Sequence, residues 1–359
     1  MRNFFISVSM ALALGYLIPA QQGTPPIQTA AADLPRILYE DAIDESGLKD
    51  LIGAHAVQYL VIYGHLADPE CKNGTIDATS LVRYIADKCR IDQEGWGVLD
   101  FEEPFDSNIL KGPASESWRP SVDTMVQAIR TVKRIFPKMR WTYYGIPGLD
   151  YYLKSDGKTF TWDDAPADLK QREIDRQIAA FRPIIIECDW IAPCLYNTVG
   201  DGRKVADTNI RAATRACVKA RVAMCVQLSK ALSGKRFVIP FISNMYQMGG
   251  GARCFSSIPY DVLLKDCAIP IHEAGADGAC IWTGAHAFIA ATTNPQKNQP
   301  DFGDCGGRVQ VAKTWAEDLG MTPEEIMSEV GRARVTRMYS DSQRDLLRAM
   351  KIAWNTPNH

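Results

Sequence analysis

Three acidic residues lie within four positions at the end of one apolar run, VLDFEEPF at residues 98–105. They are Asp100, Glu102 and Glu103. Side chains of a strand alternate between its two faces, so Asp100 and Glu102 share one facing, with Cα atoms roughly 6.5–7 Å apart. Glu103 faces the other way, and we expect it to be structural. Asp100 and Glu102 are therefore the first candidates for chemistry.

Two carboxyl groups this close suit the acid-catalysed cleavage of a glycosidic bond. A charged neighbour raises the pKa of a carboxyl group, so one of the two can stay protonated near neutral pH and act as the acid. The same residues could instead cap helices or pair with arginine. Spacing alone leaves both interpretations open.

The elements that must position this pair are short apolar runs that alternate with amphipathic stretches. Seven runs have the composition of strands: residues 36–40, 57–63, 96–102, 140–146, 190–196, 236–242 and 278–284. Most are almost continuously apolar, as a parallel sheet buried on both faces requires. The alternation predicts an α/β fold, a distorted TIM-type (β/α) barrel with seven strands, and a doubly wound open sheet is the alternative. In such a barrel, the pair would lie at the catalytic end of its strand.

Helices are expected between the strands. In residues 121–136 the apolar positions recur at helical spacing, and Pro137 ends the run. A second long pattern covers residues 208–233 and ends at Gly234. Residues 322–325, TPEE, combine an N-cap, a proline at N1 and a glutamate at N3. We expect a C-terminal helical region to begin there.

The first twenty residues have the pattern of a secretory signal peptide. Arg2 precedes an apolar run that is short for a membrane span and ends in small residues near Ala20, and a retained membrane anchor is the alternative. Residues 21–33 have the composition of a linker, and we expect 34–355 to form one barrel domain with its C-terminal helices. The protein is therefore expected to be secreted, extracellular or, in a bacterium, periplasmic, without stable membrane insertion.

Charge and cysteine usage argue against several partners. The net charge of −2 and the lack of a dense Lys/Arg tract give no reason to expect nucleic acid. The ten cysteines form no C-x-x-C and no Cys/His cluster at zinc spacing, so we expect neither a metal nor a cofactor. Their even number in an exported chain predicts some disulfides, whose pairing the sequence does not assign.

Five blocks of the sequence resemble the hyaluronidase family of glycoside hydrolases. GVLDFEE (97–103) resembles the family's D-x-E catalytic strand, and WTYYGIP (141–147) resembles its W-G-Y-Y-x-x-P strand. WIAPCLY (190–196), FVIPFISNMY (237–246) and GADGACIWTG (275–284) resemble three further strands. The blocks follow one another in the family's order, and the family's fold is a distorted barrel of seven strands.

The resemblance implies substrate-assisted hydrolysis of an N-acetylhexosamine linkage in a glycosaminoglycan such as hyaluronan. Glu102 would be the general acid and later the general base. Asp100 would hold the acetamido N–H of the substrate, whose acetamido oxygen acts as the nucleophile. The partner is then a polysaccharide.

The resemblance also implies aromatic contacts to that polysaccharide. Tyr196 would donate a hydrogen bond to the acetamido group, Tyr246 would orient the reacting sugar, and Trp282 would pack against the acetyl methyl. Tyr143 and Tyr144 alternate in facing, so one of them should point into the barrel. The sequence does not say which.

Chitinases of the D-x-x-D-x-D-x-E type are the nearest competitor. Their motif has acids where this chain has Gly95 and Val98, and the hyaluronidase pattern has an apolar residue where Val98 stands, so the hyaluronidase pattern is preferred.

A departure from the family's pattern leaves the substrate open. In place of the family's W-R-P triplet, EEPFDSN follows the strand, and Trp118-Arg119-Pro120 comes later. A chitin-like or other N-acetylated glycan, or a non-catalytic secreted barrel that binds glycans, are the alternatives.

Overall fold

The structure of the chain is a computed structural model. It describes residues 36–39, 56–68, 74–149, 152–196, 208–232, 236–246, 255–282 and 307–355. All of them belong to one compact unit, Ala32–His359. The expected signal peptide (1–20) and linker (21–33) lie outside the described residues.

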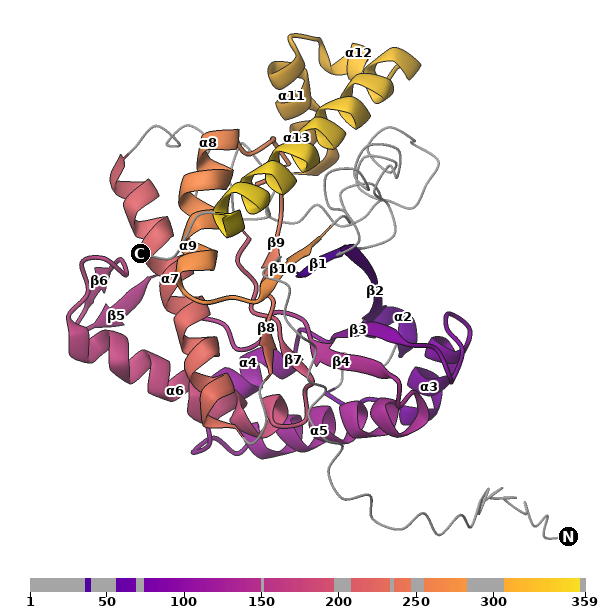
Figure 1. The fold of residues 1–359 in the computed structure, drawn as a ribbon, viewed down its shortest axis with the longest axis vertical. Helices are drawn as coiled ribbons and strands as arrows, with labels where there is room; N and C mark the ends of the chain where they lie inside the picture. Colours follow the sequence, from indigo (N-terminus) through magenta and orange to yellow (C-terminus); the bar gives the residue numbers. More distant parts are fainter. Residues whose placement is uncertain are drawn as a thin grey trace, which may run out of the picture. The chain divides into compact units, whose positions relative to one another are not determined.

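The strands are short. They are β1 (Arg36–Tyr39), β2 (Ala56–Tyr63), β3 (Gly95–Asp100), β4 (Met139–Tyr143), β5 (Leu153–Ser155), β6 (Lys158–Phe160), β7 (Trp190–Ile191), β8 (Phe237–Val238), β9 (Phe241–Ile242) and β10 (Gly278–Ile281). The helices are α2 (Gly64–Ala67), α3 (Ala78–Ala86), α4 (Phe105–Leu110), α5 (Trp118–Ile135), α6 (Ala167–Ile185), α7 (Thr208–Ala231), α8 (Tyr260–Val262), the π-helical η5 (Leu263–Ala268), α9 (Ile269–Glu273), α11 (Gly307–Leu319), α12 (Pro323–Ile326) and α13 (Glu329–Asn355). Figure 1 shows their arrangement.

In the described part of the chain, seven parallel strands close into a barrel. Six strands pair in the order β4-β3-β2-β1-β10-β9, and β7 pairs with β8. Parallel bridges between Gly145 and Pro193 and between Cys194 and Phe241 join the two groups. At the first bridge the Gly145 N–H donates to the Ala192 carbonyl at 3.0 Å. Because β8 and β9 are successive parts of one strand, the prediction of a seven-stranded barrel is confirmed, and the open sheet is excluded.

Alternate strand residues face two different cores. Side chains from six of the seven strands fill the barrel interior: Leu38, Tyr59, Trp96, Val98, Trp190, Ala192, Ile239, Phe241 and Cys280. The intervening residues, such as Leu99, pack against the helices in a larger outer core. Phe101 belongs to that outer core, so Asp100 continues the inward series of β3. The period-two rule thus holds to the end of this strand.

Gly97 of β3 has no side chain, and the ring of Trp141 on the neighbouring strand β4 fills the space beside it. It is paired in register with Trp141 of β4, whose indole is fully buried. A Cβ atom at position 97 would lie only 2.4 Å from the ring of Trp141. The barrel wall therefore requires glycine at this position.

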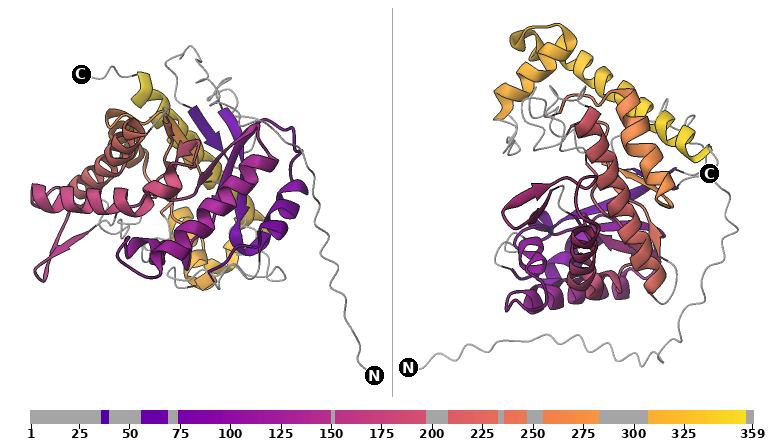
Figure 2. Two further views of the ribbon diagram at one scale, coloured as in Figure 1. Left: turned by 90° about the horizontal axis from the view of Figure 1, so that it is seen from below. Right: turned by 90° about the vertical axis from the view of Figure 1, so that its left-hand side faces the viewer.

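Helices cover the outside of the barrel, as Figures 1 and 2 show. α5 packs against β4, α3 and α6, and α7 packs against β8 and α9. The expected helices at 121–136 and 208–233 are confirmed as α5 and α7. Thr322 caps α12 through a complete capping box with Glu325, as predicted. The C-terminal helical region nevertheless begins earlier than expected, with α11 at Gly307.

A short antiparallel hairpin, β5–β6, lies in the segment after β4 and was not predicted. Its turn contains Asp156 and Gly157, both with positive φ, 51° and 73°. Two such residues in a row make the type of turn that joins tight hairpins, and Asp-Gly is its usual sequence. The Asp156-Gly157 dipeptide was therefore the sequence signal that could have predicted this hairpin.

Cysteines with free thiols in the described part of the chain include Cys89, Cys188, Cys194, Cys225 and Cys267. Burial raises the pKa of the Cys188 and Cys267 thiols to about 12. The expected disulfides are therefore not found at these positions. Cys71, Cys254 and Cys305 lie outside the described residues. No helix among the described residues is long and apolar enough to cross a membrane.

Candidate active site

The end of β3 carries the two candidate carboxylates to the mouth of the barrel. Asp100 is the last residue of the strand and is half-buried, and Glu102 is exposed two residues further on. Between them Phe101 is buried, with its ring centroid 6.3 Å from that of Phe105 and 6.4 Å from that of Tyr143. These ring contacts hold residues 100–102 in place. Both acids lie at the carboxyl end of β3, as predicted.

Glu102 is one of three neighbouring acids whose charges interact. Partial burial of its carboxyl group and, second, the charge of Glu103 raise the pKa of Glu102. Glu103 is exposed and accepts a hydrogen bond from Ser107 Oγ at 2.6 Å. Asp106, in the first turn of α4, has its pKa raised to about 7 by burial and by the charges of Glu102 and Glu103. Sequence reasoning missed Asp106, although its position four residues after Glu102 was a signal.

An aromatic row lies next to Asp100. The ring centroid of Tyr196 is 5.9 Å from that of Tyr144 and 5.7 Å from that of Trp282. The Tyr144 ring in turn meets Phe241 of the barrel interior edge-on, at 5.0 Å. The structure therefore brings three of the predicted aromatic residues together at the mouth. Such rings offer apolar faces on which a sugar can pack.

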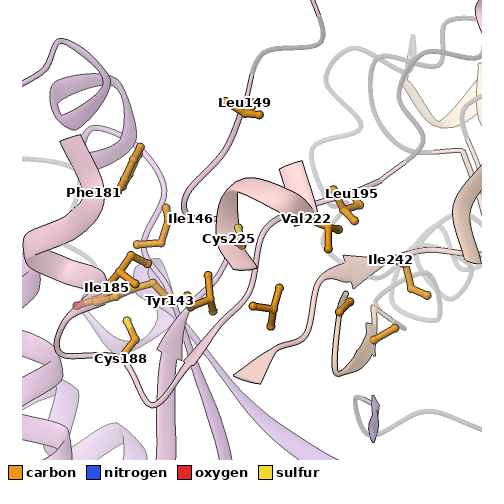
Figure 3. Packing of buried hydrophobic residues seen from close by; sticks show 14 of the residues in the cluster. Tyr143, Ile146, Leu149, Phe181, Ile185, Cys188, Leu195, Val222, Cys225 and Ile242 are labelled. Carbon is orange, nitrogen blue, oxygen red and sulfur yellow. The ribbon is translucent and has the colours of Figure 1, made fainter. Parts of the chain in front are cut away.

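The side chains of Tyr143 and Tyr144 lie on opposite sides of the barrel wall. Tyr143 is fully buried and donates its hydroxyl to the Met125 carbonyl of α5 at 2.7 Å. Figure 3 shows it among Ile185 and Cys188, in the outer core between the barrel wall and the helices. Tyr143 as a substrate contact is therefore wrong, because its hydroxyl points away from the barrel interior. Tyr144 is the inward member of the pair and remains a candidate.

The Tyr196 hydroxyl is the best placed polar group of the row. Its oxygen is buried, and no group of the described residues forms a hydrogen bond with it. The nearby Tyr144 hydroxyl donates instead to Cys194 Sγ, at 3.3 Å. Burial raises the pKa of Tyr196 well above its usual value, and Asp100 is among the charges that add to the effect. The Tyr196 hydroxyl thus stays protonated near the Asp100 carboxylate.

Tyr246 is buried in the core. Its side chain is only 2% exposed and belongs to the outer core. Its backbone N–H donates to the Ser256 carbonyl at 3.0 Å, and its carbonyl accepts from the Phe255 N–H at 2.8 Å. These two backbone hydrogen bonds close a loop after β9 at Tyr246, and a role of Tyr246 in orienting the sugar stays a prediction.

Trp282 connects the barrel to the C-terminal helices. It follows β10, is half-buried, and packs both on the barrel interior and on a second core that includes Met245, Phe255 and Trp315. The Trp315 indole N–H of α11 donates to the Phe255 carbonyl at 2.9 Å. The C-terminal helices thus support the wall of the site, which the sequence did not reveal.

Arg221 of α7 is a second residue that sequence reasoning missed. Its guanidinium donates to the Cys194 carbonyl at 2.8 Å and also to the Leu149 carbonyl. These carbonyls belong to the segments that follow β7 and β4, and the first leads directly to Tyr196. One arginine therefore ties together two of the loops that form the mouth. No group of three or more potential metal-ligating side chains is present among the described residues.

The fold and the site together define a seven-stranded β/α barrel with carboxylates and aromatic rings at its C-terminal mouth. Among solved structures, the chain is similar to bee venom hyaluronidase, with 13% identity over 81% of this chain and 99% of that chain and a TM-score of 0.49. It is also similar to bee venom hyaluronidase in complex with a hyaluronic acid tetramer, with 17% identity over 62% of this chain and 78% of that chain and a TM-score of 0.40. No family of known proteins and no individual curated protein matches the sequence.

Proposed function

We propose that the protein is a glycoside hydrolase that cleaves an N-acetylhexosamine linkage in a glycosaminoglycan such as hyaluronan. One observation carries the proposal. Asp100 and Glu102 stand together at the barrel mouth, beside a row of aromatic rings that includes Tyr196, whose buried hydroxyl forms no hydrogen bond within the described residues. Carboxylates beside sugar-sized apolar faces suit glycosidic cleavage, and the D-x-E resemblance of the sequence supports the same chemistry.

The proposed reaction is substrate-assisted, one of the exceptions to the use of two protein carboxylates. Glu102 gives its proton to the departing glycosidic oxygen while the acetamido oxygen attacks the anomeric carbon, so the glycosidic bond breaks as the new C–O bond forms. Water then opens the cyclic intermediate and gives a proton to Glu102, with retention of configuration. The raised pKa of Glu102 supports its acid role.

The remaining side chains take positioning roles in this proposal. Asp100 accepts the acetamido N–H and stabilises the positive charge that develops on the group. The Tyr196 hydroxyl donates to the acetamido oxygen, and Trp282 packs against the acetyl methyl. Tyr144 supports the Tyr196 ring. We also propose that the protein is exported to an extracellular or periplasmic location, on the pattern of residues 1–20.

The test is the release of reducing ends from hyaluronan, chondroitin and chitin oligomers by the full chain. Glu102→Gln should lower the rate at least about 100-fold, as the loss of a general acid does. Glu103→Gln is the matched control, because it removes the adjacent exposed carboxylate. It should retain most of the rate at its own pH optimum.

The outcomes separate the alternatives. Cleavage of chitin oligomers alone would replace the substrate class but keep the chemistry. Binding of these glycans without cleavage by the wild type would point to a non-catalytic glycan-binding barrel. Full activity in Glu102→Gln would show that the acid is assigned to the wrong residue.

A further inference from the structure

A pocket lies between the β5–β6 hairpin and the first half of α6, outside the barrel of strands. Its volume is about 580 Å³, within the usual range of sites that hold small molecules. Residues 152–154, at the start of the hairpin, line one side, and four residues of α6 line the other. The hairpin packs beside this helix, as Figure 1 shows.

The pocket begins close to one of the loops that form the mouth. Arg221 binds the Leu149 carbonyl together with the Cys194 carbonyl, which lies two residues before Tyr196. Tyr152 comes three residues after Leu149, so the Cα atoms of these two residues are at most about 11 Å apart. The pocket is therefore within reach of a polysaccharide that occupies the mouth.

Apolar side chains and one exposed aromatic ring give the pocket surfaces for a sugar. Leu153 and Leu169 are buried, whereas Tyr152 is 48% exposed. An exposed tyrosine offers an apolar face for a sugar ring and a hydroxyl for its polar edge. The pocket thus repeats the kind of surface that the aromatic row provides at the mouth.

The charged groups of the pocket are mainly cationic. Lys154, Arg172 and Arg176 line it, with Glu173 as the acid. Glu173 is neutralised by its neighbour: it accepts hydrogen bonds from Arg176 Nε at 2.8 Å and Nη2 at 2.7 Å, and from Gln177 at 3.0 Å. Lys154 and Arg172 therefore remain as the cations that a ligand meets.

Lys154 and Arg172 keep the capacity to bind an anion. Within the described part of the chain, the Lys154 ammonium group forms no hydrogen bond or ion pair. Arg172 pairs with Asp168 through Nη1 at 2.5 Å, and its Nε and Nη2 atoms bind no described residue. Because that pair is exposed, it holds the guanidinium only weakly. The Nε–Nη2 edge presents two parallel N–H groups, which match the two oxygens of a carboxylate.

We propose that this pocket is a second glycan-binding site, outside the cleavage site, and that it holds a carboxylated sugar unit of the polysaccharide. Tyr152 packs against the sugar ring, and Lys154 and Arg172 bind its carboxylate. The choice of a glycosaminoglycan as the ligand rests on the proposed function. A chain held at two places binds more tightly than a short one, without any new contact at the bond that is cleaved.

The first test measures binding and needs no cleavage. Glu102→Gln provides the background, and the ligands are a hyaluronan decasaccharide and its carboxyl methyl ester, which has the same sugars without the charges. Lys154→Gln combined with Arg172→Gln should raise the Kd of the charged ligand about 5-fold to 10-fold, as the loss of two exposed ion pairs does. The Kd of the methyl ester should be unchanged. Isothermal titration calorimetry measures both.

Lys88→Gln combined with Arg90→Gln is the matched control. Both residues are exposed, and Arg90 pairs with Asp92 at 2.9 Å, much as Arg172 pairs with Asp168. They lie between α3 and the start of β3, at the amino end of the strands and opposite the mouth. The control loses the same charge as the pocket variant, and its Kd for both ligands should stay at the value of the background.

Two outcomes of the binding test would overturn the inference. One is an unchanged Kd for the charged decasaccharide in the pocket variant. The other is an equal loss of affinity for the charged ligand and for the methyl ester, because the pocket would then not recognise the carboxylate.

The second test is the dependence of cleavage on chain length. With Glu102 in place, the same two substitutions in the pocket should raise KM for long hyaluronan and leave kcat unchanged. KM for the shortest oligosaccharide that is cleaved should not change, because a short chain does not reach the pocket. Equal KM values for long hyaluronan in the variant and the wild type would contradict the proposed site. If the wild type cleaves no glycan, the proposed function fails, whereas the binding test still decides whether the pocket recognises the sugar carboxylate.

Discussion

The rings of Tyr196 and Trp282 lie 5.7 Å apart at the barrel mouth, although they follow strands β7 and β10, which are not neighbours in the barrel. The strand formed by β8 and β9 lies between these two. Its Phe241 side chain fills the interior, so the two larger rings meet above it. This contact builds one continuous apolar wall from two distant parts of the sequence, and it holds the Tyr196 hydroxyl near Asp100.

Tyr196→Phe should lower the cleavage rate about 10-fold to 100-fold, because the hydroxyl that would donate to the acetamido oxygen is lost. The free energy of unfolding should change by less than about 0.5 kcal/mol, since no described group loses a hydrogen bond. Initial rates and urea unfolding of the same preparation measure both quantities. A variant that is destabilised but fully active would contradict the role.

Tyr143→Phe should show the opposite pattern. It leaves the Met125 carbonyl without its buried donor, which costs about 1–2 kcal/mol of unfolding free energy. The cleavage rate at 25 °C should stay at the wild-type level, because the hydroxyl faces α5. Urea unfolding and the same activity assay check this prediction. A large loss of activity without destabilisation would return Tyr143 to the site.

Gly97→Ala should destabilise the barrel by about 1–3 kcal/mol, because the added Cβ meets the buried ring of Trp141 at 2.4 Å. Gly148→Ala is the control, since its Cβ would meet nothing closer than the Gly145 carbonyl oxygen at 3.4 Å. Thermal and urea unfolding of the two variants measure the difference. Equal stability would mean that Trp141 repacks without cost.

The raised pKa of Asp106 predicts a pH dependence of stability. The folded state keeps the Asp106 proton up to about pH 7, whereas the unfolded chain loses it near pH 3.8. Between these values the folded state binds more protons, so the contribution of this group to stability falls as pH rises. Asp106→Asn should therefore gain about 4 kcal/mol on the wild type between pH 4 and pH 8.

Urea unfolding at several pH values measures this gain. Asp87→Asn provides the baseline for the loss of an exposed carboxylate. A stability difference between Asp106→Asn and the wild type that stays constant from pH 4 to pH 8 would show that the Asp106 pKa is not raised.

The barrel could be predicted because its signals are local. Each strand is a nearly continuous apolar run, and each long helix has an apolar stripe, so element type follows from composition and period alone. The shared facing of Asp100 and Glu102 was predicted from the same period of two. The helix α5 and the capping box at Thr322 were confirmed for that reason.

What the sequence by itself determined, then, is the seven-stranded barrel and the acidic end of β3. Only the tertiary structure decided that Tyr144 and not Tyr143 faces inward, that Tyr246 is buried in the outer core, and that Arg221 ties two mouth loops together. Alternation fixes relative facing within a strand, but absolute facing depends on which side the helices cover. Contacts between loops depend on how the ring of strands closes, and no local pattern encodes that closure.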